Sequence, residues 1–228
     1  MKTIGLVGGI NWASSMEYYR LINLFMNEKK GGLHAARVII YSLNFGEIDA
    51  MRQKKDQLSI MLTLKHAALK LEASGADCIL IASNTMHQFA EDIQQALRIP
   101  LLHIGEATAT QASQSAYKKV GLLGTKSIME LPFYKEKLTE QAIETLVPEE
   151  DDQNFIQQCI SSELVFNQIN SESKNRFLQI IRQLQEKGAE AIILGCTEIP
   201  LLVQQEDCDI PLLNTIEIHA RTAVEFAL

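Results

Sequence analysis

Residues 75–83 read GADCILIAS, and residues 188–196 read GAEAIILGC. Each stretch opens with glycine and alanine, continues through an acidic residue into an apolar run, and ends on a small polar side chain. That side chain is Ser83 in the first stretch and Cys196 in the second, in both cases eight positions after the opening glycine. The similarity predicts two copies of one structural unit, each with a buried strand that leads to a candidate reactive group.

Two further pairs of similar segments support an internal repeat. KTIGLVG at residues 2–8 resembles KVGLLG at residues 119–124, and IPLLH at residues 99–103 resembles IPLLN at residues 210–214. The three pairs occur in the same order along both parts of the chain, which is hard to obtain by chance. We therefore expect two similar halves that pack together directly, without a low-complexity linker.

Short apolar runs alternate with longer segments whose apolar residues recur at helical spacing, which is typical of βαβ units around parallel sheets. The expected strands are 3–9, 37–43, 78–83, 99–105, 119–125, 190–196 and 210–214. The expected helices are 14–26, which starts from a serine cap, and 57–74, 86–97, 131–145, 174–187 and 215–226. The acidic stretch Glu149–Asp152 is expected to form a solvent-facing turn.

These elements predict an α/β protein of two pseudo-symmetric, Rossmann-like domains, each with a mostly parallel sheet. The first domain comprises residues 1–98 with 211–228 and carries Ser83, and the second comprises residues 99–210 and carries Cys196. Ligands of open α/β sheets bind outside the carboxyl ends of the strands, so we expect the active site in the cleft between the two domains.

Composition excludes several classes of function. The chain has 228 residues with 46% apolar and 21% charged residues, as is ordinary for a globular cytoplasmic protein. A formal charge of −7 argues against a nucleic-acid binder. No run approaches the roughly 18–20 apolar residues of a membrane span. The opening GLVGGI lacks the third glycine of a dinucleotide-binding motif, and the five histidines show no metal-ligand spacing. We therefore expect no cofactor and no metal.

Ser83 and Cys196 each stand between an apolar strand and a helix-forming run. Side chains at the start of a helix experience the positive end of its dipole, which lowers the pKa of a thiol and favours bound anions. Two proton carriers on opposite sides of one site suit racemisation or epimerisation, in which a proton leaves one face of a carbon and returns to the other. Alternatively, Cys196 is a small buried hydrophobic residue, as most free cysteines are. Cys78 and Cys159 are expected in the core.

Four segments resemble the aspartate/glutamate racemase family, specifically its cofactor-independent amino-acid racemases. They are GLVGGINWASSMEYYRLIN (5–23), SNTMH (83–87), LLGTKSIME (122–130) and GCTEIPLL (195–202), and the resemblance spans residues 1 to about 226. It implies two pseudo-symmetric α/β domains, an acidic amino acid as substrate and a homodimer. Members usually carry a cysteine at both reactive positions; this sequence is similar to the branch with a hydroxyl residue at the first, where it has Ser83.

The substrate-binding residues follow from chemistry and resemblance together. Asn84 and Thr85 directly follow Ser83, Thr197 is the counterpart of Asn84, and Thr125 and Ser127 form a second anion-binding turn. Family members often present a carboxylate ligand near Arg52, which is otherwise a surface arginine in a basic loop. Glu198 could orient the substrate ammonium, take a proton from the thiol, or cap its helix. His87, four residues after Ser83, could tune the site or pack within its helix.

We therefore predict a cofactor-independent racemase of aspartate or glutamate in which Cys196 and Ser83 serve opposite faces of Cα. Other relatives with a lone cysteine are decarboxylases of substituted malonates. The alternatives are accordingly a lone-cysteine decarboxylase or cis–trans isomerase of a dicarboxylic acid, and an inactive sensor of acidic amino acids.

Overall fold

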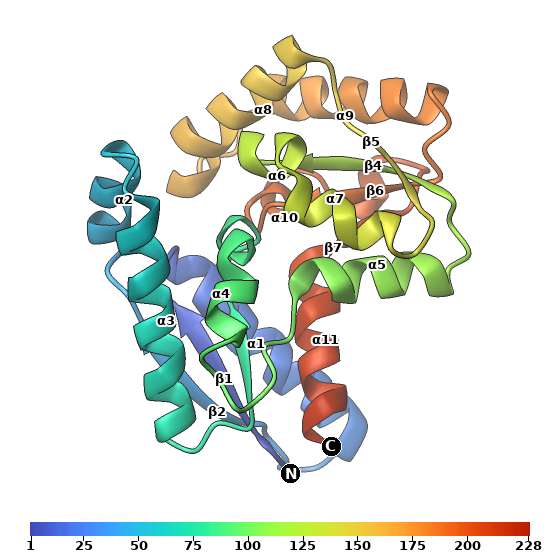
Figure 1. Cartoon of the computed structure of the whole chain (residues 1–228). Helices are drawn as coiled ribbons and strands as arrows, with labels where there is room; N and C mark the ends of the chain where they lie inside the picture. The colour runs from blue at the N-terminus through green and yellow to red at the C-terminus, as the bar shows by residue number, and fades with distance from the viewer. The chain divides into compact units, whose positions relative to one another are not determined.

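The computed structural model describes all of residues 1–228, and the chain divides into two compact units. The first unit consists of Met1–His103 and His219–Leu228, and the second of Ile104–Ile218. The chain therefore passes between units twice, after His103 and after Ile218 (Figure 1). The sequence-based boundaries differ from these mainly at residues 211–218, which here belong to the second unit because they contain a strand of its sheet.

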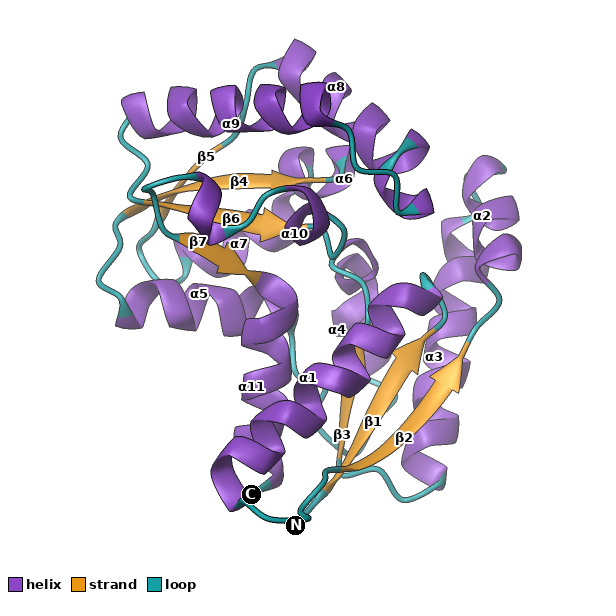
Figure 2. Ribbon diagram, turned by 180° about the vertical axis from the view of Figure 1, so that it is seen from behind, coloured by secondary structure: helices purple, strands orange, loops and turns teal.

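The first unit is built on a three-stranded parallel sheet in the order β2-β1-β3 (Figure 2). Its strands are β1 (Thr3–Gly8), β2 (Arg37–Ser42) and β3 (Cys78–Ile81). Its helices are α1 (Trp12–Lys30), α2 (Phe45–Gln53), α3 (Gln57–Ala73), the 3₁₀-helix η1 (Thr85–Phe89), α4 (Ala90–Gln94) and the later part of α11 (Thr215–Ala227). Helices α1 and α3 lie on opposite faces of this sheet, so its strands are covered on both sides.

The second unit is built on a four-stranded parallel sheet in the order β5-β4-β6-β7. Its strands are β4 (Lys119–Gly124), β5 (Glu144–Leu146), β6 (Ala191–Gly195) and β7 (Leu212–Asn214). Its helices are α5 (Ile104–Gln114), α6 (Lys126–Glu130), α7 (Pro132–Thr139), α8 (Glu150–Ser162), α9 (Ser171–Glu186) and α10 (Ile199–Leu202), with 3₁₀-helices η2 (Leu164–Phe166) and η3 (Gln205–Asp207). The predicted fold class, α/β with parallel sheets in two parts, is confirmed.

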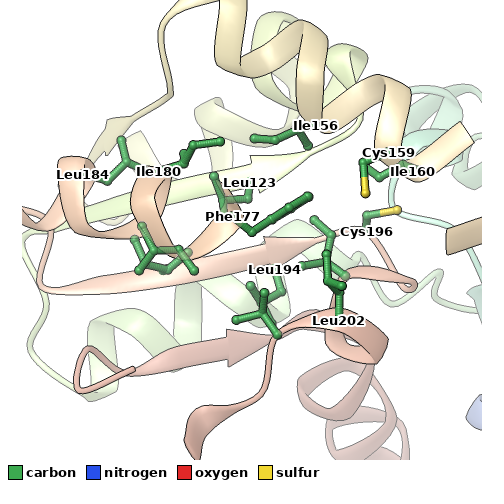
Figure 3. Packing of buried hydrophobic residues seen from close by; sticks show 14 of the residues in the cluster. Leu123, Ile156, Cys159, Ile160, Phe177, Ile180, Leu184, Leu194, Cys196 and Leu202 are labelled. Carbon is green, nitrogen blue, oxygen red and sulfur yellow. The ribbon is translucent and has the colours of Figure 1, made fainter. Parts of the chain in front are cut away.

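Alternating side chains of the second sheet fill two separate cores. Leu123, Ile192 and Leu194 point to one face, where they pack with α8 and α9 through residues such as Ile156 and Phe177 (Figure 3). Val120, Leu122 and Ile193 point to the other face, where they pack with α5 and α7. This period of two along continuous apolar strands is what a parallel sheet covered on both faces requires.

The internal repeat extends to individual hydrogen bonds. Gly75 and Gly188 both end a helix with a positive φ, of 93° and 96°. Gln94 of the first unit accepts from the Leu101 amide at 2.6 Å and donates to the Ile99 carbonyl at 3.1 Å. Gln205 of the second unit makes the same pair of bonds, at 2.9 and 3.1 Å, with Leu212 and Ile210. Ser83 and Cys196 therefore follow equivalent strands of equivalent frameworks.

Several expected elements differ in the structure. Residues 99–105 form a single bridge, Ile79 to Leu101, rather than a strand, because α5 already begins at Ile104. Strand β5 overlaps the end of the expected helix 131–145, because the helix that forms there, α7, already ends at Thr139. The acidic residues Glu150–Asp152 open α8 instead of forming a turn, since carboxylates are favourable in the first turn of a helix. Asn11, rather than a serine, caps α1 by accepting from the Ala13 amide at 3.0 Å.

Every helix falls short of the length or the apolar character that a membrane crossing demands.

Candidate active site

Cys196 immediately follows strand β6, and its thiol contacts a carboxylate. Its Sγ donates to Glu198 Oε2 at 2.9 Å, and the Thr197 hydroxyl donates to the same oxygen at 2.8 Å. Cys196 is 6% exposed and Glu198 8% exposed, so the pair is almost entirely shielded from water. One buried carboxylate oxygen thus holds the thiol and the neighbouring hydroxyl together at the carboxyl end of the sheet.

The electrostatics of Cys196 contradict the expectation of a lowered thiol pKa. Burial raises the pKa of Cys196 well above its usual value, and the charge of Glu198 and the hydrogen bond to it raise it further. The backbone amides of Glu198 and Ile199 act in the opposite direction but are outweighed. The following helix α10 has only four residues, so its dipole is weak. Without substrate, Cys196 is therefore a protonated thiol, and the Glu198 carboxylate lies at hydrogen-bond distance from its proton.

Cys196 also belongs to the apolar core between the second sheet and α8 and α9, where Cys159 lies as well (Figure 3). Cys159 donates to Glu163 Oε2 at 3.6 Å, and burial, together with that carboxylate, raises the pKa of its thiol to about 11. Cys159 thus has a similar chemical environment on a helix rather than at the end of a strand. It provides an internal comparison for the chemistry of Cys196.

Ser83 lies two residues beyond β3 and is half-buried. The turn after it is a 3₁₀-helix, η1, and not the regular α-helix expected from the sequence. The His87 amide bonds to the Asn84 carbonyl, three residues back, at 3.1 Å. The Ser83 carbonyl accepts instead from Nδ1 of the His87 ring, at 2.8 Å. The loop that presents Ser83 is therefore held by a side chain where a regular helix would use a backbone amide.

Gly8, the last residue of β1, and Gly9 after it lie at the sheet edge where Ser83 follows β3, although the sequence analysis did not assign them to the site. Strand β1 pairs with β3, so the loop that follows β1 lies at the same edge of the sheet as Ser83. Gly9 has a φ of 76°, and a Cβ there would lie 2.1 Å from the Leu43 carbonyl oxygen. The Gly9 amide donates to the Ser15 hydroxyl at 2.8 Å. Only glycine fits this turn, and the Gly8-Gly9 pair was the available sequence signal.

The other candidate residues of the first unit lie in two places. Asn84, which is 3% exposed, and the half-buried Thr85 adjoin Ser83 directly. Arg52 lies near the end of α2, and not in a loop as expected, and pairs with Asp49 at 2.6 Å with 58% of its side chain exposed. The structure thus groups Asn84 and Thr85 with Ser83, whereas Arg52 is a surface side chain that already has a carboxylate partner.

In the second unit, Thr125 and Ser127 follow β4, the neighbour of β6, and both are half-buried. They therefore lie at the same sheet edge as Cys196 and Thr197. Thr125 is the first residue before the five-residue helix α6. The backbone amide of Lys126 between them already donates to Gln157 Oε1 at 2.9 Å. An anion at this turn would consequently rely on the Thr125 and Ser127 hydroxyls more than on that amide.

Three buried histidines near Ser83 were largely missed by the sequence analysis. The His87 ring contacts those of His103 and His219, with centroid separations of 4.9 and 5.5 Å. Only His87 was singled out, because it follows Ser83 by four residues; the other two are distant in the sequence and no pattern joins them. Despite the presence of three imidazoles, no group of side chains here has a metal-binding arrangement.

Comparison with known proteins agrees with the fold. The family model for Asp/Glu/Hydantoin racemase matches residues 7–223. The broad specificity amino-acid racemase RacX of Bacillus subtilis is 30% identical over 158 residues, which cover 69% of this chain and 67% of that protein. The chain also resembles the structure of a proposed Asp/Glu racemase from Yersinia pestis, with a TM-score of 0.94, 41% identity, and coverage of 100% of this chain and 99% of that one.

A second similar structure is that of an aspartate racemase homologue from Pyrococcus horikoshii, with a TM-score of 0.85 and 33% identity. It covers 100% of this chain and 99% of that chain. With the family model spanning nearly the whole sequence and both parallel sheets reproduced in these structures, the chain belongs to the Asp/Glu/Hydantoin racemase family of enzymes.

Proposed function

We propose that this enzyme interconverts the enantiomers of an acidic amino acid, aspartate or glutamate, by proton transfer at Cα without a cofactor. Cys196 serves one face of Cα and Ser83 the opposite face. The observation that carries the proposal is the equivalence of these two residues, which follow matched strands in two frameworks with the same backbone hydrogen bonds.

The Cys196–Glu198 pair supplies the base on the thiol side. A protonated thiol cannot remove a proton, and burial keeps this one protonated. Glu198 accepts the thiol proton through the existing 2.9 Å contact, and the resulting thiolate takes the α-proton of the substrate. The backbone amides of Glu198 and Ile199, which favour the thiolate, then stabilise it. The role of Glu198 is therefore to accept the thiol proton, in preference to binding the substrate ammonium.

Ser83 supplies the proton on the other face. Its hydroxyl donates its proton to the carbanion-like carbon, and the alkoxide that would remain takes a proton from solvent. The proton that Glu198 accepted from the thiol returns to solvent, so the enzyme ends each cycle in its starting protonation state. A hydroxyl is a much weaker acid than a thiol and has no carboxylate beside it comparable to Glu198, so we expect this half of the reaction to be the slower one. Enantiomers have equal free energies, so kcat/KM must nevertheless be the same in both directions, whereas kcat and KM can differ separately.

Stabilisation of the carbanion requires donors around the substrate carboxylates. Asn84 and Thr85 beside Ser83, and Thr197 beside Cys196, are the groups that we assign to the α-carboxylate, where negative charge develops in the transition state. The Thr197 hydroxyl would have to exchange its bond to Glu198 for one to the substrate. Thr125 and Ser127 are assigned to the second anion-binding turn. Arg52 would have to exchange its contact with Asp49 for the side-chain carboxylate of the substrate.

A deuterium experiment tests the proposal. The protein is incubated in deuterated water with each enantiomer of aspartate and of glutamate, and both Cα deuteration and optical activity are followed. We expect deuterium at Cα together with loss of optical activity, and we expect Cys196→Ala to abolish both. Cys159→Ala is the matched control, because it removes a buried thiol with a carboxylate partner from the same core. Wild-type protein that exchanges no Cα proton of these substrates would refute the proposal.

The asymmetry of the two loops also favours a second candidate, in which Cys196 acts alone. Only Cys196 has a carboxylate at hydrogen-bond distance from its reactive atom. A lone-cysteine decarboxylase would release carbon dioxide from a 2-substituted malonate and add one solvent deuteron to the product on one face. Measurement of carbon dioxide release from such malonates therefore separates this reading from racemisation.

A further inference from the structure

The Ser83 loop is attached to a buried cluster of aromatic side chains, which we call the histidine cluster: Tyr18, His87, His103 and His219. All four are buried; their exposed fractions are 0, 2, 9 and 0%. Histidine is usually at least partly exposed, and this cluster holds three of the five histidines of the chain. The proposed chemistry of Ser83 uses none of these side chains directly, so their presence needs a separate explanation.

Hydrogen bonds define the tautomers of two of the imidazoles. His219 Nε2 lies 2.7 Å from the Leu102 carbonyl oxygen, which can only accept, so Nε2 carries the hydrogen. His219 Nδ1 therefore accepts from the Tyr18 hydroxyl, at 2.7 Å. By the same reasoning His87 Nδ1 carries a hydrogen, because its partner is the Ser83 carbonyl. The His87 Nε2 atom is buried and has no hydrogen-bond partner, so no hydrogen bond links His87 to another imidazole.

The cluster therefore does not form a proton relay to Ser83. His87 touches the other two rings edge-on, through packing at 65° and 70°, while its ring nitrogen Nδ1 bonds to the backbone of Ser83. That bond reaches the carbonyl of the residue whose hydroxyl is proposed to act. The arrangement is suited to positioning a backbone, and not to supplying a proton.

The two rings that contact His87 stand at the ends of the first unit. His103 is the last residue of its first segment and His219 is the first residue of its second segment. His103 is also held against β3, because the Leu102 amide donates to the Ile79 carbonyl at 2.9 Å. The rings that contact His87 thus come from both places where the chain leaves or enters this unit, and the one at His103 follows a residue whose backbone is bonded to the strand that leads to Ser83.

The second unit holds its reactive residue differently. Its counterpart of His103 is Asn214, and the residue four positions after Cys196 is Pro200, so it has no equivalent cluster. The Cys196 carbonyl accepts from the Ile199 backbone amide at 3.2 Å, whereas the Ser83 carbonyl accepts from a side chain. The histidine cluster is accordingly specific to the loop that carries the hydroxyl.

We propose that His87 is a positioning residue for Ser83. Its Nδ1–H holds the Ser83 carbonyl, and the packed rings of His103 and His219 keep the His87 ring in the orientation that makes this bond. The inference rests on the proposed function of Ser83. A weak proton donor must be placed accurately to act, since a displacement of about 1 Å can reduce a rate on the order of 100-fold.

Two substitutions at one position separate the hydrogen bond from the packing. The amide nitrogen of asparagine occupies the place of the histidine Nδ1, so His87→Asn retains a donor to Ser83, whereas the similarly sized His87→Leu does not. We expect His87→Leu to lower kcat for racemisation about 10- to 100-fold with KM changed less than about threefold, and His87→Asn to recover at least about tenfold of that loss. His66→Asn, at an exposed histidine, is the control.

Isotope exchange provides a readout that a merely structural role would not affect. In deuterated water, Cys196 can remove and return a proton on its own face, which deuterates one enantiomer without inverting it. We expect this exchange to survive in His87→Leu while inversion falls. We also expect amide hydrogen exchange to accelerate in the peptide covering residues 82–89 of His87→Leu, and less so in His87→Asn.

The outcomes separate failure of this inference from failure of the proposed function. If wild-type protein neither exchanges nor inverts its substrates, the proposed function is wrong and this inference falls with it. If wild-type protein racemises and His87→Leu retains its kcat, only the role of His87 is refuted. Equal losses of exchange and inversion in His87→Leu would likewise refute positioning, because they would show a general loss of structure.

Discussion

Lowering the pH from 7 to 5 should destabilise the first unit through His87 and His219. The pKa of each histidine is lowered to about 3 in the folded protein, first by burial and next by a neighbouring imidazole. In an unfolded chain the pKa of histidine is about 6.5. The unfolded state therefore binds more protons than the folded state below pH 6.5. The contribution of these two neutral histidines to the free energy of unfolding is fully present above pH 6.5 and is lost as the pH falls from 6.5 toward 3.

The magnitude follows from proton linkage. At pH 5 each unfolded histidine has gained a proton that its folded counterpart lacks, which costs about 1.36 kcal/mol for each pH unit below 6.5, or about 2 kcal/mol. The two histidines together should lower the free energy of unfolding by about 4 kcal/mol between pH 7 and pH 5. Because the total for a domain is about 5–15 kcal/mol, this loss is large enough to measure easily. Interaction between the two rings affects the result little, since both remain neutral in the folded state at pH 5.

Urea unfolding at the two pH values checks this expectation. The fluorescence of Trp12, the single tryptophan, reports on the first unit, and circular dichroism reports on the whole chain. His219→Gln should reduce the pH-dependent loss to about 2 kcal/mol, while the exposed His66→Asn should leave it at about 4 kcal/mol. The reasoning is refuted if wild-type protein loses less than about 1 kcal/mol, or if His219→Gln shows the full loss.

Two further substitutions test the sites at the ends of the strands. Glu198→Gln removes a charge that raises the pKa of Cys196. Alkylation of this thiol by iodoacetamide, followed by mass spectrometry, should therefore reach its half-maximal rate at a lower pH than in wild type, while the rate of racemisation should fall. An alkylation profile with the same pH dependence as wild type would contradict the assigned contact between Cys196 and Glu198. Gly9→Ala should lower the free energy of unfolding, measured by urea titration, by at least about 2 kcal/mol, because the new Cβ would overlap the Leu43 carbonyl. Gly32 has a φ of 58° but open space around it, so Gly32→Ala should lower the free energy of unfolding by only about 1 kcal/mol. Similar losses in the two glycine variants would show that the close approach at Gly9 is not a constraint.

The repeat and the strand ends could be predicted from sequence because they depend on local patterns. Gly75 and Gly188 have the same spacing to Ser83 and Cys196, and the structure gives both glycines the same backbone conformation. An apolar run with a glycine before it and a polar residue after it is recognisable without any tertiary information. The fold class followed from repeating that pattern along the chain.

Features that depend on burial or on distant residues could not be predicted. The thiol pKa was expected to fall because a helix follows Cys196, but its direction is decided by burial and by Glu198. Strand β5 has only three residues, one of them exposed, so it carries no apolar run that a sequence pattern could detect. His103 and His219 are more than 100 residues apart, and only the folded first unit brings them to His87.

The paired glutamines Gln94 and Gln205 have an evolutionary consequence. Each makes the two matched backbone bonds described above entirely within its own unit, so neither framework depends on the identity of the reactive side chain in the other. After duplication of an ancestral half, one loop could therefore exchange a thiol for a hydroxyl while the other kept its cysteine and carboxylate. Under the proposed mechanism, such independence would let selection alter the acid strength on one face of the substrate at a time.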